Sequence, residues 1–490
     1  MKIQEIAQKK YAGLITLLVI ALVIGIYHIA TTVLIAKDGV YYIEFAKSFY
    51  GGFSRAIEDN RFGYPLLIFL VHKLLNVFSS WNSNISWIIS AQTTTLICRV
   101  LAIVLLYFIG KKIIGAEKTF IAILVLIFLP EAAKIGTDTL RDWPYIFSLS
   151  LSLLFLLYGI ERGKIIFFGL TGLICGLSFF IRPEVAQIAL YGGLWGIANI
   201  IWHKFDMSRL RTATALCVMS ICFILPLGFY AYHSGKVIPD KVKALVAERS
   251  TGNDNYIIDD KSNTLLKAGI FDNKIFSAIN KLVERLGKHL MWYFVPILGL
   301  GIYSRIKQNQ LHRLEKLFYP AFLILNLLML IALYLHYGYI SSRHCLSIIV
   351  FTIFFIPAGI ESISKLFADK FRWPKVQTTQ TILLIGLGIC ASRLWEPIRM
   401  DKQYYRQASN WLRENTKEND IIFSAEPRIY FYAERQGVLN IYGHIPTECK
   451  YAIRFNENDK EIEFDRPVKL LTQIKSKSSK SKKIDIFEVF

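Results

Sequence analysis

Charged residues are scarce in this sequence. Asp, Glu, Lys and Arg make up only 19% of its 490 residues, whereas soluble domains average about 25%. Acidic residues are the scarcer kind, which leaves a formal net charge of +20. Hydrophobic residues, at 53%, gather in long runs broken by short basic stretches. This composition excludes an ordinary soluble protein of several domains.

Several kinds of site are also missing from the sequence. The seven cysteines show neither the spacing of a zinc site nor the pattern of a disulfide framework. There is no glycine-rich phosphate loop, zinc-binding helix motif or Ser/His/Asp pattern. No recognition motif for nucleic acid accompanies the basic charge, so we expect no nucleic-acid partner.

The apolar runs predict an α-helical polytopic membrane protein with about eleven transmembrane helices, because about 20 apolar residues cross the core of a bilayer. The expected spans are residues 12–36, 85–110, 118–131, 144–160, 165–181, 185–202, 212–232, 289–304, 317–335, 344–361 and 378–395. The first run is too long for the core of a signal peptide, and we interpret it as a retained anchor.

Basic residues in the short loops predict the orientation. One side carries most of them, including Lys9, Lys10, Lys111 and Lys112, and we assign that side to the cytoplasm. The N-terminus is therefore expected inside. An odd number of spans then places the C-terminal segment outside.

The expected organisation is a transmembrane domain, residues 1–395, followed by a small extracytoplasmic α/β domain, residues 396–490. Two long outer segments interrupt the first domain, at 37–84 and 233–288. The polar composition of 233–288 predicts a mobile loop that could close over a site.

Shorter elements are expected within these outer segments. In 37–84 we expect helices from Tyr41 to Tyr50 and from Tyr64 to Phe78, the second lying along the membrane surface. The C-terminal domain is expected to contain helices at 404–414 and 427–435 and strands at 420–423, 438–441, 451–455 and 484–489.

Asp38 is the first candidate catalytic residue, because it directly follows the first span. Charged side chains near membrane depth are costly and therefore often functional. A carboxylate there could be the general base for an acceptor hydroxyl. Alternatively, Asp38 could cap a helix that starts near Gly39.

Asp142 is the second candidate catalytic carboxylate, in the outer loop before Trp143 and Pro144. It is also a natural cap for the next span. Asp138, in the same loop, is the alternative carboxylate. Asp38 and Asp142 facing one cleft could share a divalent cation such as Mg²⁺ or Mn²⁺, hold an amine, or divide base and positioning roles.

Basic side chains at the same outer face are candidate substrate-binding residues. Arg61 precedes Tyr64 by three residues, Arg182 separates two spans, and Arg343 with His344 opens another. Arginine suits a phosphate because it donates to two oxygens and stays charged. Each could instead extend to lipid headgroups. These residues fit a transferase that uses a lipid-phosphate donor, and equally a transporter for an anionic solute.

The order of these motifs resembles the GT-C class of integral-membrane glycosyltransferases, in particular bacterial relatives of protein O-mannosyltransferases and of the lipid A aminoarabinose transferase. Four stretches carry the resemblance: Asp38 to Lys47 with Gly51-Gly52, Arg61 to Leu67, Thr137 through Asp142-Trp143-Pro144 to Arg182-Pro183-Glu184, and Ser342-Arg343-His344. Two positions depart from the family pattern. Gly39 stands where many relatives have a second acidic residue, and His344 stands where tyrosine is common.

The resemblance implies an inverting hexosyl- or pentosyltransferase of the bacterial inner membrane. Its donor would be a polyprenyl-phosphate monosaccharide, and its acceptor a glycolipid, polysaccharide or protein of the cell envelope, with membrane lipids around it. Asp38 would be the base, Asp142 would position the acceptor or a cation, and Arg61 with Arg343 would hold the donor phosphate. Tyr64, Asp138, Arg182 and His344 would complete the substrate site. The alternatives are a polymerase or ligase for lipid-linked oligosaccharides and a transporter or flippase for lipid-linked sugars.

Overall fold

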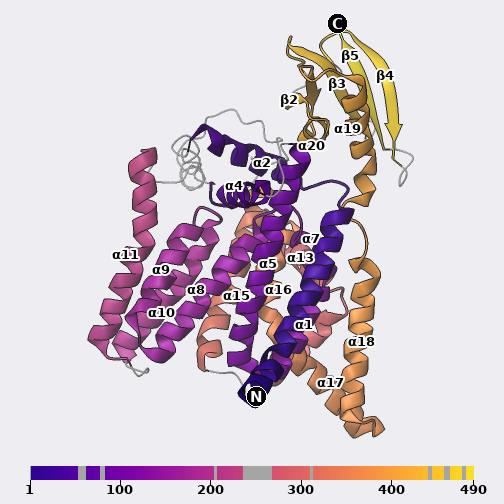
Figure 1. The fold of residues 1–490 in the computed structure, drawn as a ribbon. Helices are drawn as coiled ribbons and strands as arrows, with labels where there is room; N and C mark the ends of the chain where they lie inside the picture. The colour runs from indigo at the N-terminus through magenta and orange to yellow at the C-terminus, as the bar shows by residue number, and fades with distance from the viewer. Residues whose placement is uncertain are drawn as a thin grey trace.

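The computed structural model shows a bundle of long helices with a small sheet at the end opposite the N-terminus (Figure 1). The structure describes residues 2–52, 62–77, 83–202, 207–235, 268–308, 313–439, 444–456, 464–476 and 482–490. The expected fold class, a mostly helical membrane protein with a small C-terminal sheet domain, is confirmed.

Each expected span falls on a helix of this bundle. The bundle helices are α1 (Lys2–Thr31), α5 (Asn84–Ile114), α6 (Ala116–Phe128), α8 (Asp142–Arg162), α9 (Ile165–Ser178), α10 (Gln187–Trp202), α11 (Arg209–Ser234), α14 (Phe294–Lys307), α15 (Arg313–Tyr337), α16 (Leu346–Thr352), α17 (Ile356–Phe371) and α18 (Lys375–Leu394). The short 3-10 turn η3 (Ser342–Cys345) precedes α16, and η4 (Ile353–Phe355) joins α16 to α17, so these elements form one span. The turn η2 (Pro183–Ala186) precedes α10.

Within the described residues, seven candidate spans are long and apolar enough to cross a membrane. Helices α6, α9 and α14 have only 13, 14 and 14 residues. At 1.5 Å per residue they reach about 20 Å, which is less than the roughly 30 Å hydrocarbon core.

Small residues let the bundle helices approach closely. A Cβ added to Gly172 of α9 would lie 2.1 Å from the carbonyl oxygen of Met219 in α11. Gly359 of α17 is equally close to α14, where the corresponding distance to the Ile297 oxygen is 1.9 Å. Larger side chains at these positions would push the helix pairs apart, as expected for helices packed inside a membrane.

Two helices, α2 (Lys37–Ser48) and α4 (Gly63–Asn76), lie between the bundle and the sheet (Figure 1). The turn η1 (Phe49–Gly51) ends the first of them. Both helices expected in segment 37–84 are therefore confirmed, although Phe78 lies outside the described residues. A further short helix, α7 (Pro130–Ile135), precedes the loop that carries Asp138.

The expectation of a loop over 233–288 is wrong for its second part. Residues Ala268–His289 form helix α13, while 236–267 lie outside the described residues. The polar cluster that suggested a loop, at 253–260, lies outside the described residues, whereas apolar Leu282 and Leu286 of α13 pack against the bundle.

The C-terminal segment folds as a five-stranded mixed sheet with the strand order β2-β1-β3-β5-β4. Its elements are η5 (Met400–Lys402), α19 (Gln403–Asn415), β1 (Ile421–Ser424), α20 (Pro427–Tyr432), β2 (Gln436–Leu439), β3 (Cys449–Asn456), β4 (Val468–Lys475) and β5 (Lys483–Val489). Strand β1 pairs in parallel with β2 and β3, and β5 pairs antiparallel with β3 and β4. The sequence-based reading missed edge strand β4, in which half of the side chains are polar and most are exposed, including Leu470 and Leu471.

Candidate active site

The residues before Asp38 are held by the C-terminal segment. Arg399 Nη1 donates to the carbonyl oxygen of Leu34 at 3.0 Å. The backbone N–H of Ile35 donates to the Tyr432 hydroxyl at 3.1 Å, and Arg428 Nη1 donates to the Ile35 oxygen at 3.1 Å. Because these backbone groups are buried and need partners, the sheet domain determines the path of the chain into α2.

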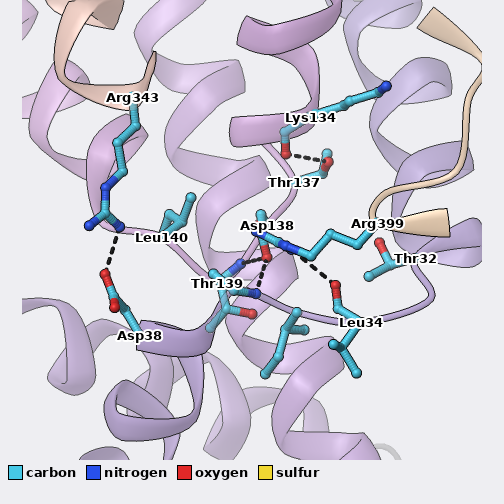
Figure 2. Close-up of polar contacts among 12 residues, drawn as sticks. Thr32, Leu34, Asp38, Lys134, Thr137, Asp138, Thr139, Leu140, Arg343 and Arg399 are labelled. Carbon is cyan, nitrogen blue, oxygen red and sulfur yellow. Dashed lines mark hydrogen bonds and ion pairs between the residues drawn. The ribbon is translucent and has the colours of Figure 1, made fainter. Parts of the chain in front are cut away.

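Asp138 holds the same stretch from the bundle side (Figure 2). Its Oδ1 accepts from the backbone N–H groups of Ala36 at 2.9 Å and of Thr139 at 2.8 Å, and its Oδ2 pairs with Arg399. The side chain is only 3% exposed. In this structure Asp138 positions the chain before Asp38, and its predicted substrate contact stays a prediction.

Asp38 projects from the first turn of α2 toward Arg343, 2.6 Å away (Figure 2). Its side chain is 43% exposed and that of Arg343 is 30% exposed. The capping alternative is wrong, because Ala36 occupies the N-cap position and no side chain caps the helix. One turn later, burial raises the pKa of Tyr42, so this phenol beside the site keeps its proton.

Arg343 lines one wall of a polar pocket of about 120 Å³. Its charged and polar lining residues are Arg141, Asp142, Tyr145, Arg182, Glu184, Asn326, Arg343, His344 and Ser347. The structure therefore brings together four predicted site residues, Arg182, Arg343, Asp142 and His344. Asp38 is joined to them through Arg343.

Asp142 and Arg182 form the most buried ion pair of this pocket. Their atoms Oδ1 and Nη1 are 2.6 Å apart, and the Asp142 side chain is 3% exposed. The Arg182 guanidinium also lies 5.0 Å from the centre of the Tyr145 ring. The expected cap is again wrong: Arg141 is the N-cap of α8, and the Asp142 carboxylate binds Arg182 instead of a backbone N–H.

Tyr64, a predicted substrate residue, does not line this pocket. Tyr64 is fully buried on α4, and its hydroxyl is 2.8 Å from Thr95 Oγ1 on α5. The Tyr64 ring meets the Tyr42 ring edge to face, with centroids 5.2 Å apart. Tyr64 thus supports α2 from below, while Arg61 lies outside the described residues.

Neutral polar residues of the pocket were not found from the sequence. Tyr145, Asn326 and Ser347 line it, and Gln187 connects the first two by hydrogen bonds. Asn326 is a polar residue within an apolar run, which is the signal that could have found it.

An apolar cavity of about 810 Å³ adjoins the polar pocket. Consecutive residues of α8 separate the two, since Ile146 lines the polar pocket and Phe147 lines the apolar cavity. The apolar walls come from α4, α5, α9 and α11. Arg141 links the two spaces, because it lines the polar pocket and donates to the carbonyl oxygen of Ile181, a residue of the apolar wall.

A divalent cation would require carboxylates that are free to bind it. Asp38 and Asp142, the predicted ligands, are each paired with an arginine. Among the residues the structure describes, no group of three His, Cys, Asp or Glu side chains could hold a metal ion. These residues alone do not fit a metal, so no step of the mechanism is derived through one.

Comparison with known proteins supports a glycosyltransferase fold. Residues 65–229 match the family model of dolichyl-phosphate-mannose-protein mannosyltransferase. The chain is similar to ArnT from Cupriavidus metallidurans bound to undecaprenyl phosphate, with a TM-score of 0.59, 10% identity and 98% of both chains covered. No curated protein sequence gives a significant match.

A second similar fold is the oligosaccharyltransferase of Archaeoglobus fulgidus. Its apo form has a TM-score of 0.56 and 14% identity, with 92% of this chain and 70% of that chain covered. The same enzyme, AglB, in complex with an inhibitory peptide and a dolichol-phosphate gives a TM-score of 0.55, also with 14% identity and 92% and 70% coverage. The described bundle and outer helices therefore share the fold of ArnT and AglB, and residues 65–229 match a family of mannosyltransferases.

Proposed function

We propose that this chain transfers a monosaccharide from a polyprenyl-phosphate donor to a hydroxyl group of a cell-envelope acceptor, at the outer face of the bacterial inner membrane. The N-terminus would be cytoplasmic and the C-terminal domain extracytoplasmic. One observation carries the proposal: a small polar pocket with arginines and carboxylates adjoins a large apolar cavity among the bundle helices. A lipid-linked sugar phosphate has the same two parts.

The apolar cavity is the proposed place for the polyprenyl tail. Its volume of about 810 Å³ and its nearly unbroken apolar lining suit a flexible hydrocarbon chain. The similar ArnT structure holds undecaprenyl phosphate and the similar AglB structure holds a dolichol-phosphate. These neighbours support a lipid-phosphate donor for this chain.

Arg343 is the proposed phosphate ligand. Its guanidinium is partly exposed at the pocket wall and already binds one carboxylate oxygen, so a phosphate oxygen can take a similar place. Arg182, held by Asp142, adds positive charge at the same wall. Arg61, three residues before Tyr64 in the sequence, is proposed as a further phosphate ligand.

Asp38 is the proposed general base. The acceptor oxygen attacks the anomeric carbon from the face opposite the phosphate, and the configuration inverts. As the new C–O bond forms, the acceptor proton passes to Asp38 and the bond to the phosphate oxygen breaks. The phosphate leaves with the electron pair, and the arginines stabilise its charge. Asp142 acts by holding Arg182 in the pocket.

The test is transfer of radiolabelled sugar from defined undecaprenyl-phosphate sugars to cell-envelope acceptors by the purified full chain. Transfer from a monosaccharide monophosphate donor is the expected result. Transfer only from oligosaccharide diphosphate donors would favour the polymerase or ligase. Movement of intact lipid-linked sugar across a proteoliposome bilayer without any transfer would favour a transporter and overturn the proposal.

A further inference from the structure

A network of neutral polar side chains forms the floor of the polar pocket. Gln187 Nε2 donates to the Tyr145 hydroxyl at 2.9 Å, and Gln187 Oε1 accepts from the Tyr191 hydroxyl at 2.9 Å and from Asn326 Nδ2 at 2.8 Å. Ser347 Oγ lies 3.4 Å from Asn326 Oδ1 and completes the network. All five residues are buried and come from four different helices.

Burying these polar side chains so deep in the bundle costs free energy unless they face a cavity or a binding partner. Asn326 lies eleven residues before the outer end of α15 at Tyr337, which is about 16 Å along a helix. Polar side chains at such depth are expensive and usually face a cavity or a partner. Tyr145, Asn326 and Ser347 do face the pocket.

The hydrogen bonds within the floor leave capacity for a ligand. The Tyr145 hydroxyl accepts from Gln187 and makes a further hydrogen bond with the Ser347 hydroxyl, which a ligand hydroxyl could replace. The Ser347 contact with Asn326 is long at 3.4 Å, so this hydroxyl can turn toward a ligand at small cost. The floor can therefore donate to and accept from hydroxyl groups.

Charge divides the pocket into two parts. The cations Arg141, Arg182 and Arg343 and the carboxylates of Asp142 and Glu184 belong to its charged wall. The network of Tyr145, Asn326 and Ser347 carries no charge. A molecule that fills both parts would have an anionic group beside a neutral group with several hydroxyls.

We propose that this floor is the subsite for the sugar ring of the donor, and that Asn326 and Ser347 select a neutral, hydroxyl-bearing monosaccharide. This proposal rests on the proposed function, because the phosphate at the arginines would place the attached sugar over the network. The size agrees. A water needs roughly 10–15 Å³ of such volume, so a pocket of about 120 Å³ has room for roughly the heavy atoms of one hexosyl group.

The test compares binding of three kinds of lipid to the purified full chain. The probes are bare undecaprenyl phosphate and a panel of undecaprenyl-phosphate hexoses, with the corresponding uronic acid as a charged analogue. The pocket variants are Ser347→Ala and Asn326→Ala. One matched control is Ser364→Ala, a buried serine in the same span that donates within its helix and accepts from Thr379. The other is Asn199→Ala, a buried asparagine near the other end of the bundle.

Wild type should bind at least one neutral hexose lipid more tightly than bare undecaprenyl phosphate and than its uronic acid analogue. Each pocket variant should weaken binding of that hexose lipid about tenfold, the effect of one lost buried hydrogen bond. Binding of bare undecaprenyl phosphate should stay within about twofold, and both controls should resemble wild type.

Equal weakening of both lipids in the pocket variants would show a purely structural network and overturn the sugar subsite. So would a wild type that does not prefer any hexose lipid over bare undecaprenyl phosphate. The proposed function fails by a different result: selective sugar binding that depends on Asn326 and Ser347, without any transfer. Binding and transfer are therefore measured separately on the same samples.

Discussion

Two aspartate–arginine pairs flank the start of α2. They share the same charged groups but differ in burial and in hydrogen bonding. The Asp38 carboxylate pairs with Arg343, and its side chain is 43% exposed. Asp138 is 3% exposed, pairs with Arg399, and also accepts two backbone N–H groups. The contrast separates a carboxylate that can exchange its partner from one that holds the chain in place.

The energies of the two pairs should differ accordingly. An exposed ion pair contributes about 0–1 kcal/mol, so an incoming phosphate can take Arg343 from Asp38 at little cost. Breaking a buried pair costs about 3–5 kcal/mol, because one charge is left without a partner. The Asp138–Arg399 pair is therefore suited to support the site and unsuited to open during turnover.

The largest expected effect is on activity when Asp38 is replaced. Asp38→Ala should lower the rate of sugar transfer by roughly 10²–10⁴, the contribution of a general base. Thermal unfolding of the variant should shift little, since only an exposed pair is lost. A variant that unfolds at much lower temperature would instead make Asp38 a structural residue.

The next largest effect is on stability when Asp138 is replaced. Asp138→Ala should lower the free energy of unfolding by about 3–5 kcal/mol, because Arg399 and two backbone N–H groups lose their acceptor. Thermal denaturation of the detergent-solubilised chain measures this change. If Asp138→Ala melts like wild type but no longer transfers sugar, Asp138 belongs to the chemistry and the contrast with Asp38 fails.

Arg343 should affect lipid binding more than folding. Arg343→Met should weaken binding of undecaprenyl phosphate roughly tenfold or more, because a charge-assisted hydrogen bond to the phosphate contributes about 1.5–3 kcal/mol. Arg343→Lys should retain part of the affinity, since lysine keeps the charge but loses the paired donors. Unchanged binding in both variants would place the phosphate elsewhere.

Tyr432 offers a smaller test of the contact between the sheet domain and the chain before Asp38. Tyr432→Phe leaves the Ile35 N–H without its acceptor and should cost about 1–3 kcal/mol of stability. Burial raises the pKa of Tyr432 from 10.0 to about 12. Its contribution to wild-type stability is therefore present below pH 10 and lost between about pH 10 and 12, a loss that Tyr432→Phe should reduce.

The smallest effect is expected far from the site, at the exposed pair Lys118–Glu361, whose side chains are 40% and 41% exposed. Lys118→Ala should change the free energy of unfolding by less than about 1 kcal/mol and leave transfer unchanged. This variant calibrates the assay. A large loss of stability or of transfer in this variant would mean that exposed ion pairs stabilise this chain by more than about 1 kcal/mol.

Local sequence patterns predicted most of the fold. The apolar runs located the bundle helices, and the stretch after the first span located α2 with Asp38. Strand β4 was missed because its apolar residues, with Leu470 and Leu471 adjacent and exposed, do not alternate as in a half-buried strand. Helix α13 was included in the expected loop because the polar cluster at 253–260 was taken to represent the whole segment 233–288.

The site was predictable only in part, because its pairs join distant segments. Asp38 and Asp142 stood out as carboxylates at the membrane boundary, and Arg343 as a cation there. That Arg343 faces Asp38 and that Arg399 faces Asp138 depends on helices brought together by the whole bundle and the sheet domain. The predictions that Asp38 and Asp142 cap helices were wrong because nearby arginines attract a carboxylate more strongly than a neutral backbone N–H does.

The most direct measurement is single-turnover transfer of radiolabelled sugar from an undecaprenyl-phosphate donor by wild type, Asp38→Asn and Asp138→Asn, each normalised to its folded fraction. We expect Asp38→Asn to bind donor and fold like wild type, yet to transfer at least about a hundredfold more slowly. Asp138→Asn should contain less folded protein, with nearly normal transfer in the folded part. Wild-type transfer by folded Asp38→Asn would contradict the assignment of Asp38 as the base.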